Sequence, residues 1–144
     1  MCLILAAWQV HPEYPLIVAA NRDEYFARPT RSAAFWPDAP NVLAGRDLLA
    51  GGTWLGITRG PRPFRFAALT NYRDPLRENP TATSRGALVS GFLRGTASAL
   101  DYLAEVEPVG ARYNGFNLLV GDSKTLACYN NVEGHVRILA PGIH

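Results

Sequence analysis

The chain has 144 residues, the size of one ordinary domain, and its 48% hydrophobic and 18% charged residues allow a buried core. Its formal net charge is +2, and the basic residues are scattered, without the Lys/Arg cluster or aromatic interleaving of a nucleic-acid surface. These features favour a soluble globular domain and exclude nucleic acid as the expected partner.

Residues 3–10 form an apolar stretch that is too short for a membrane span, has no basic segment before it and leads into a turn. We therefore expect neither a signal peptide nor a transmembrane helix. Cys2 and Cys128 lack the spacing of zinc ligands and are expected to be reduced thiols, while His11 and His135 are expected at the surface. A cytoplasmic location fits these features best.

The first predicted elements are two strands, at residues 3–10 and 16–20, joined by a proline-bearing connection at residues 11–15. Both strands are almost continuously apolar, so we expect the sheet that they form to be covered on both faces. Residues 26–49 carry three prolines and no sustained period, and we expect an irregular excursion over the sheet edge.

The remaining pattern predicts more strands and a pair of helices. Residues 53–58 and 64–71 read as a second hairpin. Ser84 is predicted to cap a helix that ends at Gly95, and Thr96 to cap a second helix through about Val106. Three further strands are predicted at residues 115–121, 126–129 and 136–139. This order of strands, helices and strands indicates one layered α+β domain over residues 1–144.

The first hairpin predicts which residues are neighbours. If its connection is centred near Glu13, facing residue numbers sum to about 26, which sets Cys2 opposite Glu24 to within about two positions. Cys2 is therefore expected beside the run Asn21-Arg22-Asp23-Glu24.

Removal of Met1 would make Cys2 the first residue, with a thiol and an α-amino group, so that nucleophile and base sit on one residue. An arginine favours a thiolate and a carboxylate can orient the amine, and Arg22 and Asp23 are the right types for these roles. The alternative is that Cys2 is a small buried hydrophobe and that the charged run is a solvated strand end. The residues alone leave both interpretations open.

Two other side chains are candidates for the same chemistry. Asn71 follows an apolar strand and could donate a hydrogen bond to an oxyanion, although asparagine at a strand end is commonly a turn former. Trp54 could form a pocket wall or belong to the core.

Several motifs together carry a resemblance to a known family. They are Met1-Cys2, Asn21-Arg22-Asp23-Glu24 with the two alanines before it, Gly51-Gly52-Thr53-Trp54-Leu55-Gly56, Thr70-Asn71-Tyr72-Arg73, Ser84-Arg85-Gly86 and Tyr113-Asn114-Gly115-Phe116-Asn117-Leu118-Leu119. The chain resembles the NRDE family, also called the transport and Golgi organization protein 2 family, over almost its whole length.

That family is similar to the N-terminal-nucleophile hydrolases of the cysteine amidase type, and the resemblance implies their four-layer αββα sandwich. It also implies hydrolysis of a non-peptide C–N bond in a linear amide, without a cofactor or a metal. Cys2 would be the nucleophile, Arg22 and Asp23 would flank it, and Asn71 would bind the oxyanion. The substrate-binding residues would be Asn21, Glu24 and Trp54. The alternative that the resemblance leaves open is a non-catalytic haem or lipid binding and trafficking protein of the same fold.

Residues 141–144 resemble the start of a segment that continues in relatives as Gly-Leu-Ser-Asn. We therefore expect this chain to be the N-terminal portion of a longer domain. A shortened four-layer fold would expose an unpaired sheet edge and apolar faces, which implies a partner or self-association into a homo-oligomer.

Overall fold

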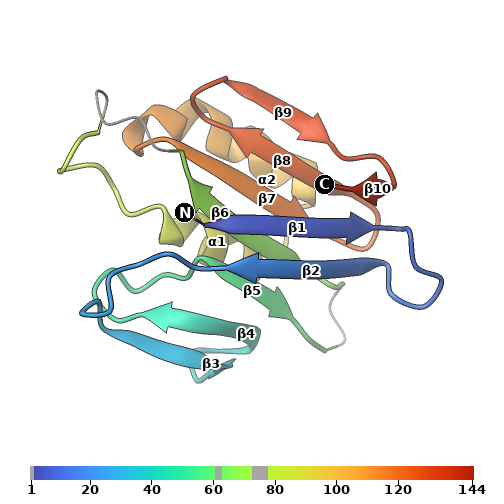
Figure 1. Cartoon of the computed structure of the whole chain (residues 1–144), viewed down its shortest axis with the longest axis horizontal. Helices are drawn as coiled ribbons and strands as arrows, with labels where there is room; N and C mark the ends of the chain where they lie inside the picture. Colours follow the sequence, from blue (N-terminus) through green and yellow to red (C-terminus); the bar gives the residue numbers. More distant parts are fainter. Residues whose placement is uncertain (1, 61–62, 73–77) are drawn as a thin grey trace.

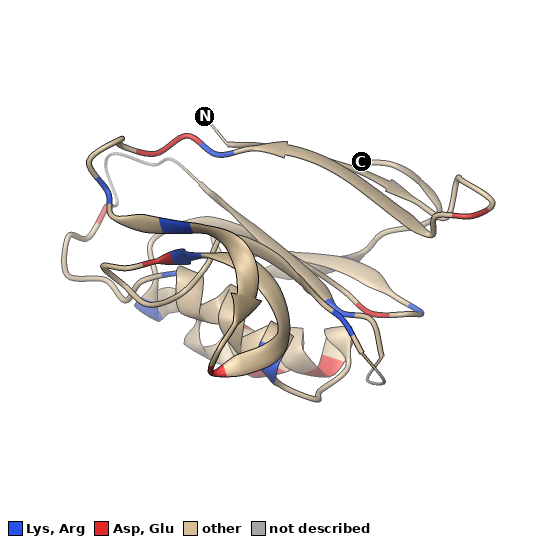
Figure 2. Cartoon of the chain, turned by 90° about the horizontal axis from the view of Figure 1, so that it is seen from below, with Lys and Arg blue, Asp and Glu red and all other residues tan. Residues whose placement is uncertain are grey.

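The computed structural model describes residues 2–60, 63–72 and 78–144. Met1 and Arg73, which belong to two of the motifs above, lie outside the described residues. The chain forms a mixed α/β structure in which two α-helices lie against one face of a seven-stranded sheet and a three-stranded sheet lies over its other face (Figure 1). Figure 2, seen from below, shows these layers edge-on.

The smaller sheet contains the predicted first hairpin. Strands β1 (Leu3–Trp8) and β2 (Leu16–Asn21) pair antiparallel, and β10 (Gly142–Ile143) adds to the other edge of β1. Leu3 pairs with Asn21, so facing residue numbers sum to 24 rather than 26, and this register sets position 22 opposite Cys2, two positions from the expected Glu24 and within the expected tolerance. The sequence pattern did not predict β10.

The larger sheet is an antiparallel meander in which each strand pairs with the next along the chain. Its order is β3 (Thr30–Trp36), β4 (Ala39–Asp47), β5 (Leu55–Thr58), β6 (Phe66–Asn71), β7 (Phe116–Gly121), β8 (Leu126–Asn130) and β9 (His135–Ile138). The structure confirms the predicted second hairpin, β5–β6, and the three strands after the helices.

The prediction of an irregular excursion over residues 26–49 is wrong, because β3 and β4 form a hairpin there. β3 is an edge strand that is exposed on both faces until Trp36, so it has no apolar alternation to reveal it. Pro29 precedes β3, Pro37 lies in the turn and Pro40 lies beside a register shift. None of these prolines lies within β3, and turns and bulges tolerate proline, which explains why the proline count was misleading.

The two helices follow β6 in the predicted order, with different first residues. Helix α1 spans Gly86–Arg94 and ends at Gly95 as predicted, but Ser84 does not cap it: the N-cap is Arg85, which makes no side-chain capping bond. Helix α2 spans Ala99–Val106, and its cap is Ser98 rather than Thr96, because Ser98 Oγ accepts from Asp101 N at 3.2 Å. A 3₁₀ helix, Glu107–Arg112, continues from α2. In the described part of the chain, no helix combines the length and apolar character needed to cross a membrane.

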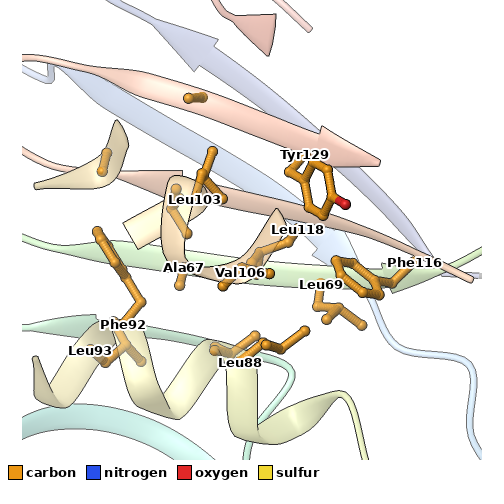
Figure 3. Packing of buried hydrophobic residues seen from close by; sticks show 14 of the residues in the cluster. Ala67, Leu69, Leu88, Phe92, Leu93, Leu103, Val106, Phe116, Leu118 and Tyr129 are labelled. Atoms are coloured by element: carbon orange, nitrogen blue, oxygen red, sulfur yellow. The ribbon is translucent and has the colours of Figure 1, made fainter. Parts of the chain in front are cut away.

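The main core lies between the helices and the larger sheet (Figure 3). Phe92 of α1 and Leu103 of α2 are fully buried there against sheet residues such as Leu118. Successive β6 residues point to opposite sides: Ala67 joins this core, whereas Ala68 joins a second core under the smaller sheet. β6 is therefore apolar without alternation, as expected for a strand covered on both faces.

The second core holds the inward-facing residues of the hairpin, including Ala6 and Trp8, against the larger sheet. The outward-facing residues Leu3, Leu5 and Ile17 are exposed. The prediction that both faces of this hairpin are covered is therefore wrong for the chain as described, because only its inner face packs against another layer.

Replacing Phe92 with alanine tests the main core. Phe92 is fully buried between α1, α2 and the sheet, so Phe92→Ala is expected to lower the free energy of unfolding by about 3–5 kcal/mol. Urea denaturation measures the change. Leu100→Ala, at a 38% exposed position on α2, is the matched control and is expected to cost less than about 1 kcal/mol. Similar losses for both variants would contradict this packing.

Candidate functional site

Cys2 is held at the end of the hairpin by the backbone of Asp23. The Asp23 N–H donates to Cys2 Sγ at 3.3 Å, and the thiol donates weakly to Asp23 O at 3.9 Å. Asn21 Oδ1 accepts from Leu3 N at 3.1 Å, which fixes the residue after Cys2. The strand pairing therefore determines where the sulfur lies, as the hairpin argument predicted.

A polar cavity of about 200 Å³ opens beside this sulfur. Most of the residues proposed from the sequence line it: Cys2, Arg22, Asp23, Glu24, Trp54 and Asn71. Asn21 is not among the lining residues, and its side-chain oxygen holds the hairpin instead. The structure thus gathers residues from the first hairpin, from the start of β5 and from the end of β6 around one space.

Asn71 is the last residue of β6 and pairs with Phe116 through its backbone. Its side chain is exposed and makes no hydrogen bond within the described residues, so its amide is available to a ligand in the cavity. Trp54 is half-buried just before β5, and its carbonyl accepts from Leu69 N at 2.8 Å. Trp54 therefore lines the cavity while its carbonyl is hydrogen-bonded to β6.

The acidic and basic residues near Cys2 neutralise one another in part. Arg22 Nη2 lies 3.6 Å from Glu24 Oε2, and Arg28 Nε lies 3.8 Å from the same oxygen. Glu24 therefore lies between two guanidinium groups that line the cavity. Figure 2 shows charged positions of both signs at the end of the molecule that holds the N-terminus.

Arg28 and Asp47 form a close ion pair in the cavity wall, with Arg28 Nη2 at 2.6 Å from Asp47 Oδ2. Asp47 Oδ1 also accepts from Leu49 N at 2.9 Å and from Ala50 N at 3.1 Å, which closes the turn after β4. Burial by itself would raise the pKa of Asp47, but the hydrogen bonds from Arg28 and from these backbone groups outweigh it and lower the pKa. Asp47 therefore joins the segment before β3 to the turn after β4.

The sequence reasoning missed a wall of the cavity formed by Ser84, Arg85 and Gly86, at the start of α1. Gly52 fixes this wall, because a Cβ on Gly52 would lie 2.5 Å from the carbonyl carbon of Gly86. Only glycine allows the chain before β5 to approach the helix so closely. Both Gly52 and Gly86 belong to motifs that carry the family resemblance, but the sequence does not reveal that these two motifs touch each other.

A second cavity, of about 360 Å³, also includes Cys2 and lies between the two sheets. Its apolar lining comes from both of them and includes Ile4, Ala6, Leu119 and Leu139. Cys128 also lines it, and burial raises the pKa of that thiol. The chain therefore carries one thiol, Cys2, that lines both cavities, and a second, Cys128, whose burial disfavours its thiolate.

No group of three or more His, Cys, Asp or Glu side chains that could hold a metal ion occurs within residues 2–60, 63–72 and 78–144. The described groups beside Cys2 are instead a backbone donor, a free amide and paired guanidinium groups. These groups can position a nucleophile and stabilise negative charge.

Comparison with known proteins agrees with the motifs. The family model described as Transport and Golgi organisation 2 matches residues 1–144. The mouse Transport and Golgi organization 2 homolog is 42% identical across 100% of this chain and 55% of its own length, and the human homolog is 41% identical over the same shares. The Drosophila melanogaster Transport and Golgi organization protein 2 is 35% identical over 83% of this chain and 45% of its own length. The chain thus spans about half the length of the curated relatives it matches.

The lowered pKa of Asp47 predicts an acid-dependent contribution to stability. The charged carboxylate stabilises the fold above the ordinary pKa of aspartate, and this stabilisation is lost as the pH falls through the lower folded-state pKa. Asp47→Asn is expected to lower the free energy of unfolding at pH 7 by about 1–3 kcal/mol and to flatten its decline below about pH 4.

Urea denaturation at pH values from 3 to 7 measures both effects for Asp47→Asn. Glu105→Gln is the control, because Glu105 is exposed on α2 and makes no hydrogen bond or ion pair within the described residues. An acid dependence that Asp47→Asn leaves unchanged would contradict the role given to this carboxylate.

Proposed function

The chain belongs to the Transport and Golgi organisation 2 family, and we propose that it is a cysteine N-terminal-nucleophile amidohydrolase that cleaves a non-peptide C–N bond. Cys2 is the nucleophile once Met1 has been removed. The observation that carries the proposal is the contact of Cys2 Sγ with Asp23 N in a cavity that also includes Asn71. A nucleophile, a held position and an oxyanion donor are the parts that acyl transfer requires.

The thiol is favourably placed for activation. The Asp23 N–H that donates to Cys2 Sγ at 3.3 Å stabilises a negative charge on sulfur. The α-amine of Cys2, free after removal of Met1, takes the thiol proton. Arg22 adds positive charge near the thiolate, and Glu24 orients the Arg22 guanidinium at 3.6 Å.

In the acylation step the thiolate attacks the amide carbon, a C–S bond forms and the carbonyl oxygen becomes an oxyanion. The Asn71 amide donates to this oxyanion, because no described residue occupies that donor. The C–N bond then breaks as the protonated α-amine of Cys2 gives its proton to the leaving nitrogen. The products are a thioester on Cys2 and a free amine.

In the second step water attacks the thioester while the α-amine of Cys2 accepts a proton from it. The C–S bond breaks, the sulfur recovers a proton, and a carboxylic acid leaves. The same amine therefore accepts and donates the proton in both steps, and the proposed mechanism uses no metal or cofactor.

The proposal extends to the fold. The described layers are helices, a seven-stranded sheet and a three-stranded sheet, and they would be three layers of an αββα sandwich. The exposed apolar residues Leu3, Leu5 and Ile17 on the outer face of the smaller sheet support a further covering layer. The curated relatives are long enough to supply it, since this chain spans 55% of the mouse protein.

The reactivity of Cys2 tests the enzyme proposal. Intact-mass spectrometry is expected to show a chain without Met1, and the neutral electrophile iodoacetamide is expected to label Cys2 before Cys128, because burial raises the pKa of Cys128. Peptide mapping identifies the labelled thiol. Cys2→Ala removes the fast label and Cys128→Ala keeps it. A retained Met1, or a Cys2 that reacts no faster than Cys128, would overturn the proposal.

A second candidate function is a non-catalytic carrier of a hydrophobic ligand such as haem or a lipid. The cavity of about 360 Å³ between the sheets, with its apolar lining, favours this alternative. Haem or fatty-acid titration of Cys2→Ala separates the two functions. A carrier keeps its affinity in this variant, whereas a hydrolase loses turnover with its fold unchanged.

A further inference from the structure

The cavity beside Cys2 is rich in arginine. Five arginines line it, Arg22, Arg28, Arg31, Arg46 and Arg85, against three carboxylates, so its described lining carries a net charge of +2. A concave surface with an excess of one charge concentrates ligands of the opposite charge. The pairing of each arginine therefore decides whether this excess is available to a ligand.

Three of the arginines are bound to carboxylates. Arg28 pairs with Asp47 at 2.6 Å, and Arg22 pairs with Glu24 at 3.6 Å. Arg46 pairs at 2.6 Å with Asp38, which lies outside the cavity lining. These guanidinium groups are already compensated, so they hold the cavity walls rather than offer a free charge.

Arg85 differs from them. It is half-buried, and its side-chain hydrogen bond runs from Nη1 to the Gly115 carbonyl at 2.9 Å. Burial lowers its pKa, while Glu78 and Glu24 act in the opposite direction, but neither carboxylate forms a salt bridge with it in the described part of the chain. An arginine stays charged in a protein, so Arg85 is a partly desolvated cation with its remaining donors uncompensated.

The exposed Arg31 of β3 lines the same cavity and also makes no salt bridge to a described carboxylate. Arg31 and Arg85 are therefore the two lining arginines that make no salt bridge to a described carboxylate, one on the larger sheet and one at the start of α1. Planar guanidinium groups with free donors suit carboxylate, sulfonate or phosphate oxygens.

We propose that the substrate of Cys2 carries an anionic group, and that Arg85 is the residue that selects for it. This inference rests on the proposed function, because it assigns a substrate class to the cavity that holds the nucleophile. The anion binds Arg85 within the cavity of about 200 Å³, with Arg31 adding charge at its edge, while the scissile bond lies at Cys2. An anionic ligand offsets the desolvation of Arg85, which a neutral ligand of the same shape does not.

Two alkylating reagents that differ in charge test the inference without knowledge of the natural substrate. Iodoacetate is anionic and iodoacetamide is its neutral analogue, and each forms a C–S bond with the thiolate as iodide leaves. The ratio of their rate constants at Cys2 is compared with the same ratio for a peptide that begins with Cys-Leu-Ile. We expect the ratio in the protein to exceed that of the peptide by roughly five- to tenfold.

Arg85→Gln removes the charge and is expected to abolish most of this preference, measured as the ratio of the iodoacetate and iodoacetamide rate constants at Cys2. Arg85→Lys keeps the charge and is expected to retain at least about half of the preference. Arg59→Gln is the matched control, because Arg59 is exposed, carries the same charge and does not line the cavity. Circular dichroism melts establish that each variant is folded.

The outcomes separate this inference from the proposed function. Rapid labelling of Cys2 by iodoacetamide without a preference for iodoacetate would overturn the anionic substrate and leave the nucleophile in place. A preference that Arg85→Gln and Arg59→Gln reduce equally would also overturn the role of Arg85. A Cys2 that reacts slowly with both reagents would overturn the proposed function, and this inference with it. If Arg85→Gln does not fold, the inference is tested by the ratio of rate constants in the wild-type protein and in Arg85→Lys. A wild-type ratio no higher than that of the peptide would overturn it.

Discussion

The rest of the structure depends on the burial of β6 and β7 on both faces. Ala67 and Leu118 pack toward the helices, whereas Ala68 and Leu119 pack toward the smaller sheet. The inward-facing residues Ala6 and Trp8 of the smaller sheet share the second core with Ala68 and Leu119, so burial of this apolar surface holds the smaller sheet against the larger one. The hairpin that carries Cys2 is therefore fixed over the larger sheet by packing at some distance from the sulfur.

This layering places the candidate site where the two sheets and α1 meet. The hairpin contributes Cys2 and the Asp23 backbone, β6 contributes Asn71 at its end, and the segment before α1 contributes Arg85. Each of these residues lies at or beside the end of a strand or helix, where backbone and side-chain groups are not all hydrogen-bonded within the strand pairing or the helix. The cavity walls are then joined by contacts that leave little freedom, such as the approach of Gly52 to the start of α1.

Much of the fold could be predicted from the sequence, and the errors have identifiable causes. Apolar runs bounded by turn-forming residues predicted the first hairpin, β5–β6 and β7–β9. The β3–β4 hairpin was not predicted, because β3 is an edge strand exposed on both faces and therefore shows no alternation of apolar and polar residues. Ser98, rather than Thr96, caps α2 because the hydrogen bond to Asp101 N sets where the helix begins. Sequence spacing alone could not distinguish two neighbouring hydroxyl residues.

For the site, the sequence by itself determined the proximity of Cys2 to Arg22 and Asp23, because a hairpin brings its two ends together whatever surrounds it. It also supplied Asn71 and Trp54 as candidates through their motifs. The tertiary structure alone decided that Arg85 faces the same cavity, and that it differs from Arg28 in having no carboxylate partner among the described residues. Such pairing depends on contacts between segments that are far apart in the chain. Residue types and local spacing fix strands and turns, but the compensation of a charge is fixed only when the layers pack.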